Sequence, residues 1–269
     1  EVSETWKVLA ENVLIKRWKG KMLEACKTGE TKVVQLLLER CNSEESGLNI
    51  KDEEGTTAFM VACVEGQTDV VKLLLGHYDK EIDLNARNYF GGTAFVIACH
   101  YGHKDVVQLL LDHSEQIDLN ARSNDGSTAF ILACYNGHKN AVQLLLENSN
   151  IDLKARDNEG YSAFMVACYE GQTDVVKLLL GHSDKEIDLN ARDDSGLTGF
   201  MYACRYGHKD VVKSLLDYSD SNIDLNARNN VGLTAFMFAC RFEHKDVVQL
   251  LLEHQVVVNI NIPESFQLS

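Results

Sequence analysis

Short apolar segments alternate with polar segments along the chain, and one stretch shows a complete structural unit. Residues 129–136 are mostly apolar, follow Thr128 as a candidate N-cap and end before Gly137, which predicts a short helix. Residues 141–146 place apolar side chains at helical spacing and predict a second helix. Residues 151–160 predict an extended segment and a turn that ends in glycine. The unit is therefore a helix, a turn, a helix and a hairpin.

The same unit recurs with a period of about 35 residues. Helices of two or three turns cannot bury an apolar face alone, so each unit must stack on its neighbours. Two helices per unit exclude a propeller, whose blades have four strands. We predict an all-α solenoid of stacked helix-turn-helix units joined by β-hairpin-like loops. The repeated apolar residues are Phe59, Phe95, Phe130, Phe164, Phe200 and Phe236, and Cys26, Cys63, Cys99, Cys134, Cys168, Cys204 and Cys240.

The repeated unit resembles the ankyrin repeat. Its pattern G-x-T-A-F-x-x-A-C-x-x-G-H-x-D-V-V-x-L-L-L, followed by I-D-L-N-A-R, is similar to the family pattern G-x-T-P-L-H-x-A-x-x-x-G-H, then V-V-x-L-L and a D-V-N-A hairpin. The resemblance covers about residues 20–262 in about seven units. Alanine or glycine replaces the family's proline, phenylalanine its leucine, and an apolar residue its histidine.

The two ends depart from the unit, as terminal repeats of a solenoid do because one face lacks a neighbour. Apolar residues at helical spacing predict an N-terminal capping helix over residues 1–18. We expect the ankyrin repeat array over residues 19–262, with its first and last units atypical. A C-terminal tail is expected over residues 263–269, beginning at the only proline, Pro263.

The composition narrows the class of partner. The 269-residue chain is 45% hydrophobic and 25% charged, which is typical of a folded protein, and its net charge is −14. Nucleic acid and anionic membrane are disfavoured, since binding them needs a dominant positive field. No run of 18 apolar residues and no signal-peptide pattern occurs, so we expect no direct membrane insertion. One cysteine per unit indicates reduced, buried thiols in an intracellular, cytoplasmic protein, which we expect to be a monomer.

The chain lacks the motifs of common catalytic sites, including the phosphate loop, the zinc-protease helix and the nucleophile elbow. Four Cys-x-x-x-His pairs, such as Cys99 and His103, have a spacing like that of metal ligands. The cysteine, however, falls in the apolar run of the first helix, and Gln67 and Gln172 replace the histidine in two units. We therefore expect a structural hydrogen bond from this position, no metal or other cofactor, and no enzymatic activity.

Positions that differ between units indicate where function lies. Residues 56–87 and 161–192 are identical at 28 of 32 positions, yet two differences add Tyr161 and Tyr169 to the second passage. Variation concentrates at the hairpin tips and the ends of the first helices, which the resemblance places on a concave groove where ankyrin proteins bind partners. Tyrosine and arginine are enriched at binding hot spots. The candidate partner-binding residues are Tyr89, Phe90, His100, Tyr101, Tyr135, Asn136, Tyr161, Tyr169, Glu170, Arg205, Tyr206, Arg241 and Phe242.

An arginine recurs once in each hairpin, at Arg87, Arg122, Arg156, Arg192 and Arg228. Each arginine could pair with a nearby turn carboxylate or asparagine, a structural role that its constancy favours. Alternatively, the series could form a ladder that binds an acidic or extended peptide.

An asparagine also recurs in the Asp-Leu-Asn sequence of the hairpins, at Asn85, Asn120, Asn190 and Asn226. Its side chain can bridge neighbouring hairpins, which would be a structural role. The ankyrin resemblance additionally implies these asparagines as candidates for modification by an asparaginyl hydroxylase.

The charge of the variable positions changes along the chain. Acidic residues cluster at positions 52–54 and 65, whereas Arg205 and Arg241 make the last units basic. We expect a non-catalytic protein–protein interaction scaffold that binds a partner protein or extended peptide through the concave groove, with the acidic part of the partner near the C-terminal units. Two alternatives remain open: a regulatory or targeting domain of a larger enzyme or channel, and an engineered repeat protein without a natural partner.

Overall fold

The computed structural model describes residues 18, 20–40, 48–49, 51–77, 82–182, 187–218, 223–254 and 256. The chain forms two compact units, residues 1–124 and residues 125–269. The first unit has a helix over residues 20–28, then α2 (Thr31–Arg40), α3 (Ala58–Val64), α4 (Thr68–Leu75), α5 (Ala94–Tyr101) and α6 (Lys104–Asp112). The second has α7 (Ala129–Tyr135), α8 (Lys139–Glu147), α9 (Ala163–Tyr169), α10 (Thr173–Leu180), α11 (Gly199–Arg205), α12 (Lys209–Asp217), α13 (Ala235–Arg241) and α14 (Lys245–Glu253). The predicted capping helix, apart from residue 18, and the tail over residues 263–269 lie outside the described residues.

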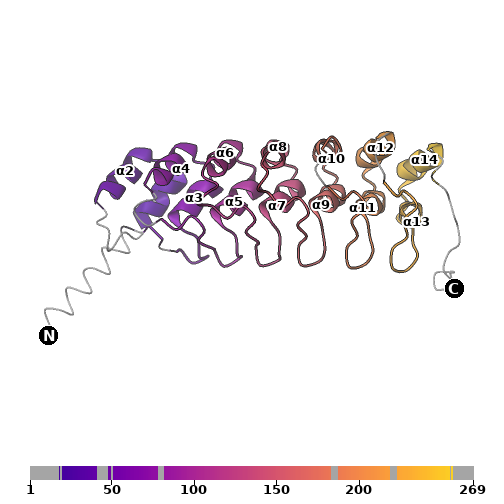
Figure 1. Ribbon diagram of the computed structural model, residues 1–269, viewed down its shortest axis with the longest axis horizontal. Helices are drawn as coiled ribbons and strands as arrows, with labels where there is room; N and C mark the ends of the chain where they lie inside the picture. The colour runs from indigo at the N-terminus through magenta and orange to yellow at the C-terminus, as the bar shows by residue number, and fades with distance from the viewer. Residues whose placement is uncertain are drawn as a thin grey trace, which may run out of the picture. The chain divides into compact units, whose positions relative to one another are not determined.

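Within each unit, equivalent helices of successive repeats pack against one another. In the first unit, α3 contacts α5, and α4 contacts α2 and α6. In the second, α7, α9, α11 and α13 contact one another in succession, and so do α8, α10, α12 and α14. Figure 1 shows the two rows of helices in each unit, with the hairpins extending from the row of first helices. The predicted all-α repeat solenoid is confirmed. An isolated antiparallel β-bridge joins Arg156 and Ser162, and most of the described hairpin residues lie in turns rather than strands.

The first helix of each repeat begins and ends as the sequence predicts. The Thr128 hydroxyl accepts a hydrogen bond from the Ile131 backbone N–H at 3.4 Å, which caps the start of α7. After the helix, Gly137 has a φ of 73°, a left-handed conformation that disfavours side chains. A Cβ atom at Gly137 would also lie 2.2 Å from Oε1 of Gln172. Glycine is therefore required here both for the turn and for the close approach of the next repeat.

The histidine or glutamine that follows this glycine joins neighbouring repeats. Nε2 of His103 lies 2.6 Å from the backbone oxygen of Val64, one repeat earlier, and Nε2 of Gln172 donates to the backbone oxygen of Tyr135 at 2.9 Å. Because a carbonyl only accepts hydrogen bonds, the histidine donates through Nε2. Both side chains thus present an N–H group at the same place, which explains why glutamine replaces histidine. The structural hydrogen bond predicted for this position is confirmed.

The repeated phenylalanines and cysteines form the core. Phe59, Phe95, Phe130, Phe164 and Phe200 are each at most 2% exposed. Six of the seven repeated cysteines are buried as free thiols, and burial raises their pKa, to about 12 at Cys26.

The expectation that all seven repeated cysteines are buried is wrong at one position. Cys240 is exposed, and Phe236 of the same helix is only partly buried. α13 carries both residues and packs on α11 on one side, and within the described residues no later first helix covers its other side. Among the described helices, α13 thus has a first-helix neighbour on one side alone, and two of its positions that are core in other repeats are less buried.

Candidate functional site

The hairpin tips and the ends of the first helices form one surface in each unit, which we call the groove face. In each unit a cavity is lined by residues of both kinds, which come from neighbouring repeats. The groove face comprises tip residues 52–54, 89–90, 159–161, 194–197 and 229–233, and helix-end residues 64–65, 100–101, 135–136, 169–170, 205–206 and 241–242.

In the first unit, a cavity of about 390 Å³ brings together the predicted residues Phe90, from a tip, and Tyr101, from the end of α5. Apolar side chains of Val61, Val64 and Ile97 contribute to its lining. Four carboxylates also line it, against a single lysine: Glu24, Asp52, Glu54 and Glu65, with Lys27. The cavity of the first unit is therefore aromatic and negatively charged.

In the second unit, a cavity of about 490 Å³ brings together the predicted residues Arg205, Arg241 and Phe242. Its lining has the opposite charge, since Asp194 is its only carboxylate. The remaining lining residues are Ser195, Leu197, Asn229, Asn230, Val231, Leu233 and Phe238. The change of charge between the two cavities agrees with the change that the sequence shows along the variable positions.

The guanidinium group of Arg205 lies among three aromatic rings. Its central carbon is 5.6 Å from the ring centre of Tyr206, 5.8 Å from that of Phe238 and 5.6 Å from that of Phe242. Two of these rings belong to the next repeat. Cation–π contacts at such distances contribute about 0.5–1 kcal/mol each at exposed sites and restrict the motion of the guanidinium group. The structure thus holds this cation in a defined position.

Next to Arg205, four tyrosines form a cluster on the groove face. The ring centre of Tyr169 lies 6.3 Å from that of Tyr161, 5.4 Å from that of Tyr202 and 4.7 Å from that of Tyr206. The structure therefore brings together the two tyrosines, Tyr161 and Tyr169, that distinguish one of the near-identical passages. Edge-to-face and tilted ring contacts of this kind stabilise each other beyond simple burial.

Tyr202 is a member of this cluster that the sequence interpretation missed. It is only 3% exposed, and its hydroxyl donates to the Asp193 carboxylate at 2.5 Å and is hydrogen bonded to the Tyr161 hydroxyl at 3.0 Å. The sequence did hold an indication of its role. The equivalent position in the other units is always apolar: Val61, Ile97, Leu132, Val166 and Phe238. A tyrosine at an apolar core position requires a partner for its hydroxyl, and Asp193 supplies one.

The environment of the cluster raises the pKa of its tyrosines. A hydrogen bond with Tyr206, followed by burial, raises the pKa of Tyr169 to about 12. Burial raises the pKa of Tyr202, and the hydrogen bond to Asp193 adds to this effect. Burial also raises the pKa of Tyr161. These side chains therefore stay protonated at neutral pH and act as hydrogen-bonding aromatic groups.

The remaining candidates differ in what they can offer a partner. Tyr89 is exposed at a hairpin tip, and the rings of His100 and Tyr101 pack edge to face at 4.9 Å. Tyr135 is exposed and hydrogen bonded to Glu170 of the next repeat, and burial followed by this bond raises its pKa. The Asn136 side chain donates to the Leu132 carbonyl at 2.9 Å and so helps to end its own helix.

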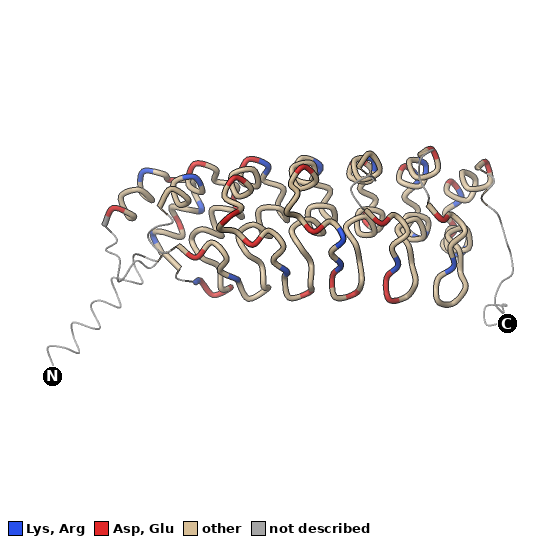
Figure 2. Tube along the Cα trace, viewed as in Figure 1, with Lys and Arg blue, Asp and Glu red and all other residues tan. Residues whose placement is uncertain are grey.

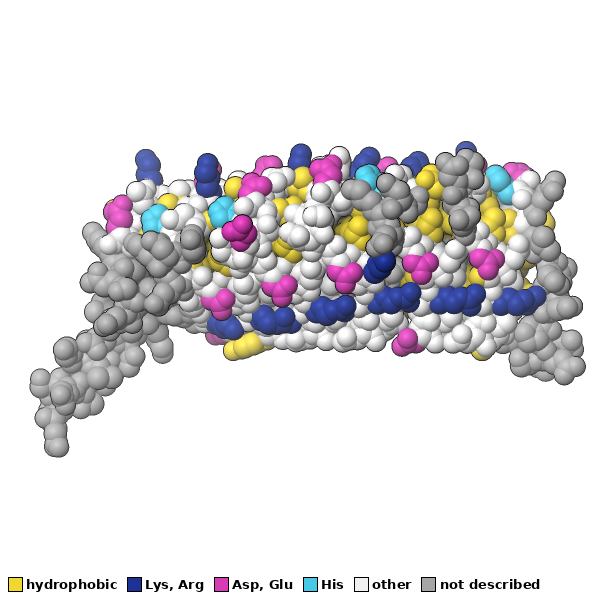
Figure 3. Space-filling model, in the orientation of Figure 1, with side chains coloured by type: hydrophobic (Ala, Val, Ile, Leu, Met, Phe, Trp, Pro, Cys, Tyr) yellow, Lys and Arg dark blue, Asp and Glu magenta, His cyan; other side chains and the backbone are white. Residues whose placement is uncertain are grey.

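Three of the recurrent arginines, Arg87, Arg156 and Arg192, bond to a backbone oxygen of the following hairpin, whereas Arg228 donates to the Gly232 carbonyl of its own hairpin. The Arg192 guanidinium donates to the Arg228 carbonyl at 2.6 Å, and Arg87 makes the same contact with the Arg122 carbonyl. The structural role considered for the series predicts a turn carboxylate or an asparagine as the partner. For Arg87 and Arg192 this prediction is wrong, because the partner is a backbone carbonyl. Figures 2 and 3 show basic residues recurring along the hairpins of each unit.

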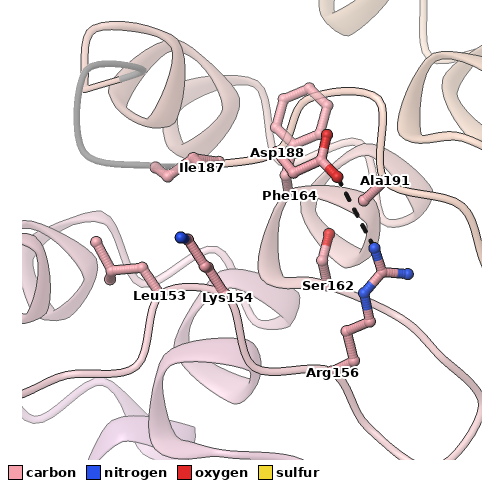
Figure 4. Close-up of a pocket in the computed structure, with 8 residues that line it drawn as sticks. All are labelled: Leu153, Lys154, Arg156, Ser162, Phe164, Ile187, Asp188 and Ala191. Atoms are coloured by element: carbon pink, nitrogen blue, oxygen red, sulfur yellow. Dashed lines mark ion pairs between the residues drawn. The ribbon is translucent and has the colours of Figure 1, made fainter.

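Arg156 has a carboxylate partner as well. Its guanidinium lies 3.9 Å from the Asp188 carboxylate across a cavity of about 270 Å³ (Figure 4), in addition to donating to the Arg192 carbonyl. Leu153, Lys154, Ser162, Phe164, Ile187 and Ala191 complete the lining of this cavity. None of its residues lines either groove-face cavity. The bonds between hairpins give Arg87, Arg156 and Arg192 a structural role, and a peptide-binding ladder stays a prediction.

The hairpin asparagines bridge neighbouring repeats. The Asn85 side chain donates to the Gln116 carbonyl at 2.8 Å and accepts from the Asp118 N–H at 2.8 Å. Asn190 likewise accepts from the Asp224 N–H at 2.7 Å. The predicted structural role is thus confirmed at these two positions, while hydroxylation stays a prediction.

Within the described part of the chain, no helix is long and apolar enough to span a bilayer, and no group of three or more potential metal ligands occurs.

Comparison with known proteins supports the same architecture. The chain matches a family model for ankyrin repeats (3 copies) over residues 21–88, 77–157, 115–193 and 164–262. It is similar to the crystal structure of the ankyrin repeat domain of Bcl-3, a unique member of the IkappaB protein family, with a TM-score of 0.71 and 26% identity over 86% of this chain and 97% of that chain. It is also similar to the ankyrin repeat protein EF0377, with a TM-score of 0.64 and 29% identity over 75% of this chain and 98% of that chain. No curated protein gives a significant match.

Proposed function

Because the chain belongs to the ankyrin repeat family, whose members are generally protein-binding modules, we propose that it is a non-catalytic scaffold that binds a partner protein or an extended peptide through the groove face. The distribution of exposed apolar side chains carries this proposal. Nine large apolar side chains of the described residues are exposed, and seven of them lie on the groove face. These seven are Tyr89, Phe90, Tyr101, Tyr135, Tyr206, Val231 and Phe242, each 41% to 67% exposed. The other two are Leu36 and Leu252.

This concentration supports partner binding for an energetic reason. Apolar side chains scattered singly over a surface are ordinary, whereas their concentration on the groove face of each unit is typical of an interaction site. Tyrosine suits such a site, since it offers a large contact area with few rotatable bonds and a polar end. The hydrogen bonds and ring contacts within the tyrosine cluster order its four side chains before a partner binds, which lowers the entropic cost of binding.

Affinity purification from cell extract, followed by mass spectrometry, tests the proposal. The protein with Tyr135→Ala and Tyr206→Ala should lose its co-purifying partner, because each true hot spot contributes about 1–3 kcal/mol of binding free energy. The matched control carries Leu36→Ala and Leu252→Ala, which remove exposed apolar side chains outside the groove face. Circular dichroism should show equal helix content in both variants. A partner that is retained by the tyrosine variant, or lost equally from the control, contradicts the proposal.

A further inference from the structure

We propose that the cavity between α11, α13 and their hairpin tips binds an acidic side chain of the partner, an aspartate or glutamate that has an apolar side chain next to it. This inference rests on the proposed function and adds the chemistry of the segment that is recognised. The cavity of about 490 Å³ is large enough for a few side chains, and its lining combines two arginines with aromatic and aliphatic groups.

Arg205 supplies the principal recognition group. Three rings hold its guanidinium, and among the described residues no carboxylate lies within ion-pair distance of it. A planar guanidinium offers parallel N–H donors that match the two oxygens of a carboxylate. Because its side chain is already ordered by the rings, little additional rotamer entropy is lost when an anion binds.

The surrounding charge favours an anion at this cavity and opposes one in the first unit. Arg241 lines the same cavity, and Asp194 is the only carboxylate in the lining. In the first unit, the cavity of about 390 Å³ has four carboxylates and one lysine, although tips and helix ends build it in the same way. An acidic segment is therefore attracted to the second unit's cavity and repelled from the first unit's cavity.

The apolar part of the lining specifies the neighbouring side chain. Val231, at the hairpin tip, is 54% exposed, and Phe242, at the end of α13, is 44% exposed. Both lie in the same cavity as Arg205. An aliphatic or aromatic residue adjacent to the acidic one would cover these two side chains and exclude water from the ion pair, which strengthens the pair.

A random peptide library displayed on phage provides the test. Selection on the wild-type protein should enrich peptides that carry Asp or Glu beside an apolar residue, and selection on Arg205→Met should lose that enrichment. For a selected peptide made by synthesis, replacing Glu by Gln should lower affinity about tenfold to a hundredfold. The same loss should follow from Arg205→Met with the original peptide, and the two changes together should cost little more than either one.

Further variants keep the test informative if Arg205→Met affects folding. Arg241→Met should also weaken binding of the acidic peptide, whereas Asp194→Asn should strengthen it up to about fivefold, by removing a like charge. Selection of peptides without acidic residues, enrichment that is the same for Arg205→Met, or no selected peptide at all would overturn the inference. Loss of the natural partner from the Tyr135 and Tyr206 variant would still support the proposed function in each of these cases.

Discussion

Nε2 of His208 lies 2.7 Å from the backbone oxygen of Tyr169, so the start of one repeat's second helix holds the end of the preceding repeat's first helix. His244 makes the same contact with the backbone oxygen of Arg205 at 2.9 Å. Tyr169 and Arg205 are both groove-face residues, one in the tyrosine cluster and the other among three rings. A constant residue of the scaffold thus positions the backbone of a variable residue on the surface.

Substitution of His208 tests this link. His208→Ala should lower the free energy of unfolding by about 1–2 kcal/mol, because the Tyr169 carbonyl loses its hydrogen-bond partner. His208→Gln should be close to neutral, since Gln172 makes the equivalent bond in another repeat. Urea unfolding followed by circular dichroism measures both changes. Equal destabilisation by Gln and Ala would contradict the role assigned to the hydrogen bond.

Glu243 occupies the helix-stop position that is glycine in the other repeats. Its φ of 59° is left-handed, and it is the only such residue besides glycine in the described part of the chain. Glu243→Gly should raise the free energy of unfolding by about 1 kcal/mol, through relief of backbone strain. Gly207→Ala should have the opposite effect, as its Cβ would lie 2.5 Å from Nδ1 of His244. Thermal unfolding of both variants checks the two signs, and stabilisation by Gly207→Ala would refute the explanation.

The tyrosine cluster predicts loss of stability in alkali. The pKa of Tyr169 is about 12 in the folded protein, above its ordinary value of 10.0, and the pKa of Tyr202 is also raised. Between pH 10 and about pH 12, the Tyr169 hydroxyl is deprotonated in the unfolded chain but stays protonated in the folded protein. The free energy of unfolding therefore falls as pH rises through this range. The contribution is fully present below pH 10 and is lost as pH passes through 12.

Urea unfolding measured at several pH values across this window checks the prediction. Tyr169→Phe should reduce the pH dependence, because the ring remains while the titrating hydroxyl is removed. Stability that stays constant across the window in the wild-type protein would show that the cluster does not hold its protons.

Arg192 distinguishes the two roles considered for the arginine series. Arg192→Ala removes the bond to the Arg228 carbonyl and should lower the free energy of unfolding by about 1 kcal/mol. Binding of the partner, measured by fluorescence anisotropy at a temperature where the variant is folded, should be unchanged. Reduced affinity with unchanged stability would instead indicate a peptide-binding ladder.

The repeat period, the helix caps and the joining role of the histidine position could all be predicted from the sequence. They follow from local requirements that recur in every unit, such as the Thr128 cap and the left-handed Gly137. The hairpin tips and the ends of the first helices are predicted to bind a partner because they differ between units in which the other positions are nearly constant. The structure shows where these residues meet: Phe90 with Tyr101, and Arg205 with Phe242.

The sequence by itself determined the repeat, its secondary structure and the positions that vary, because short-range propensities and stacking on adjacent repeats specify an ankyrin solenoid. Only the tertiary structure decided that Tyr202 joins the tyrosine cluster and that the arginine series bonds to backbone carbonyls. It also decided that Arg205 lies among rings of two repeats. Except for the contact between Arg205 and its neighbour Tyr206, these contacts join residues about one repeat apart. The direction and length of each side chain, which sequence spacing does not specify, decide which residue it contacts.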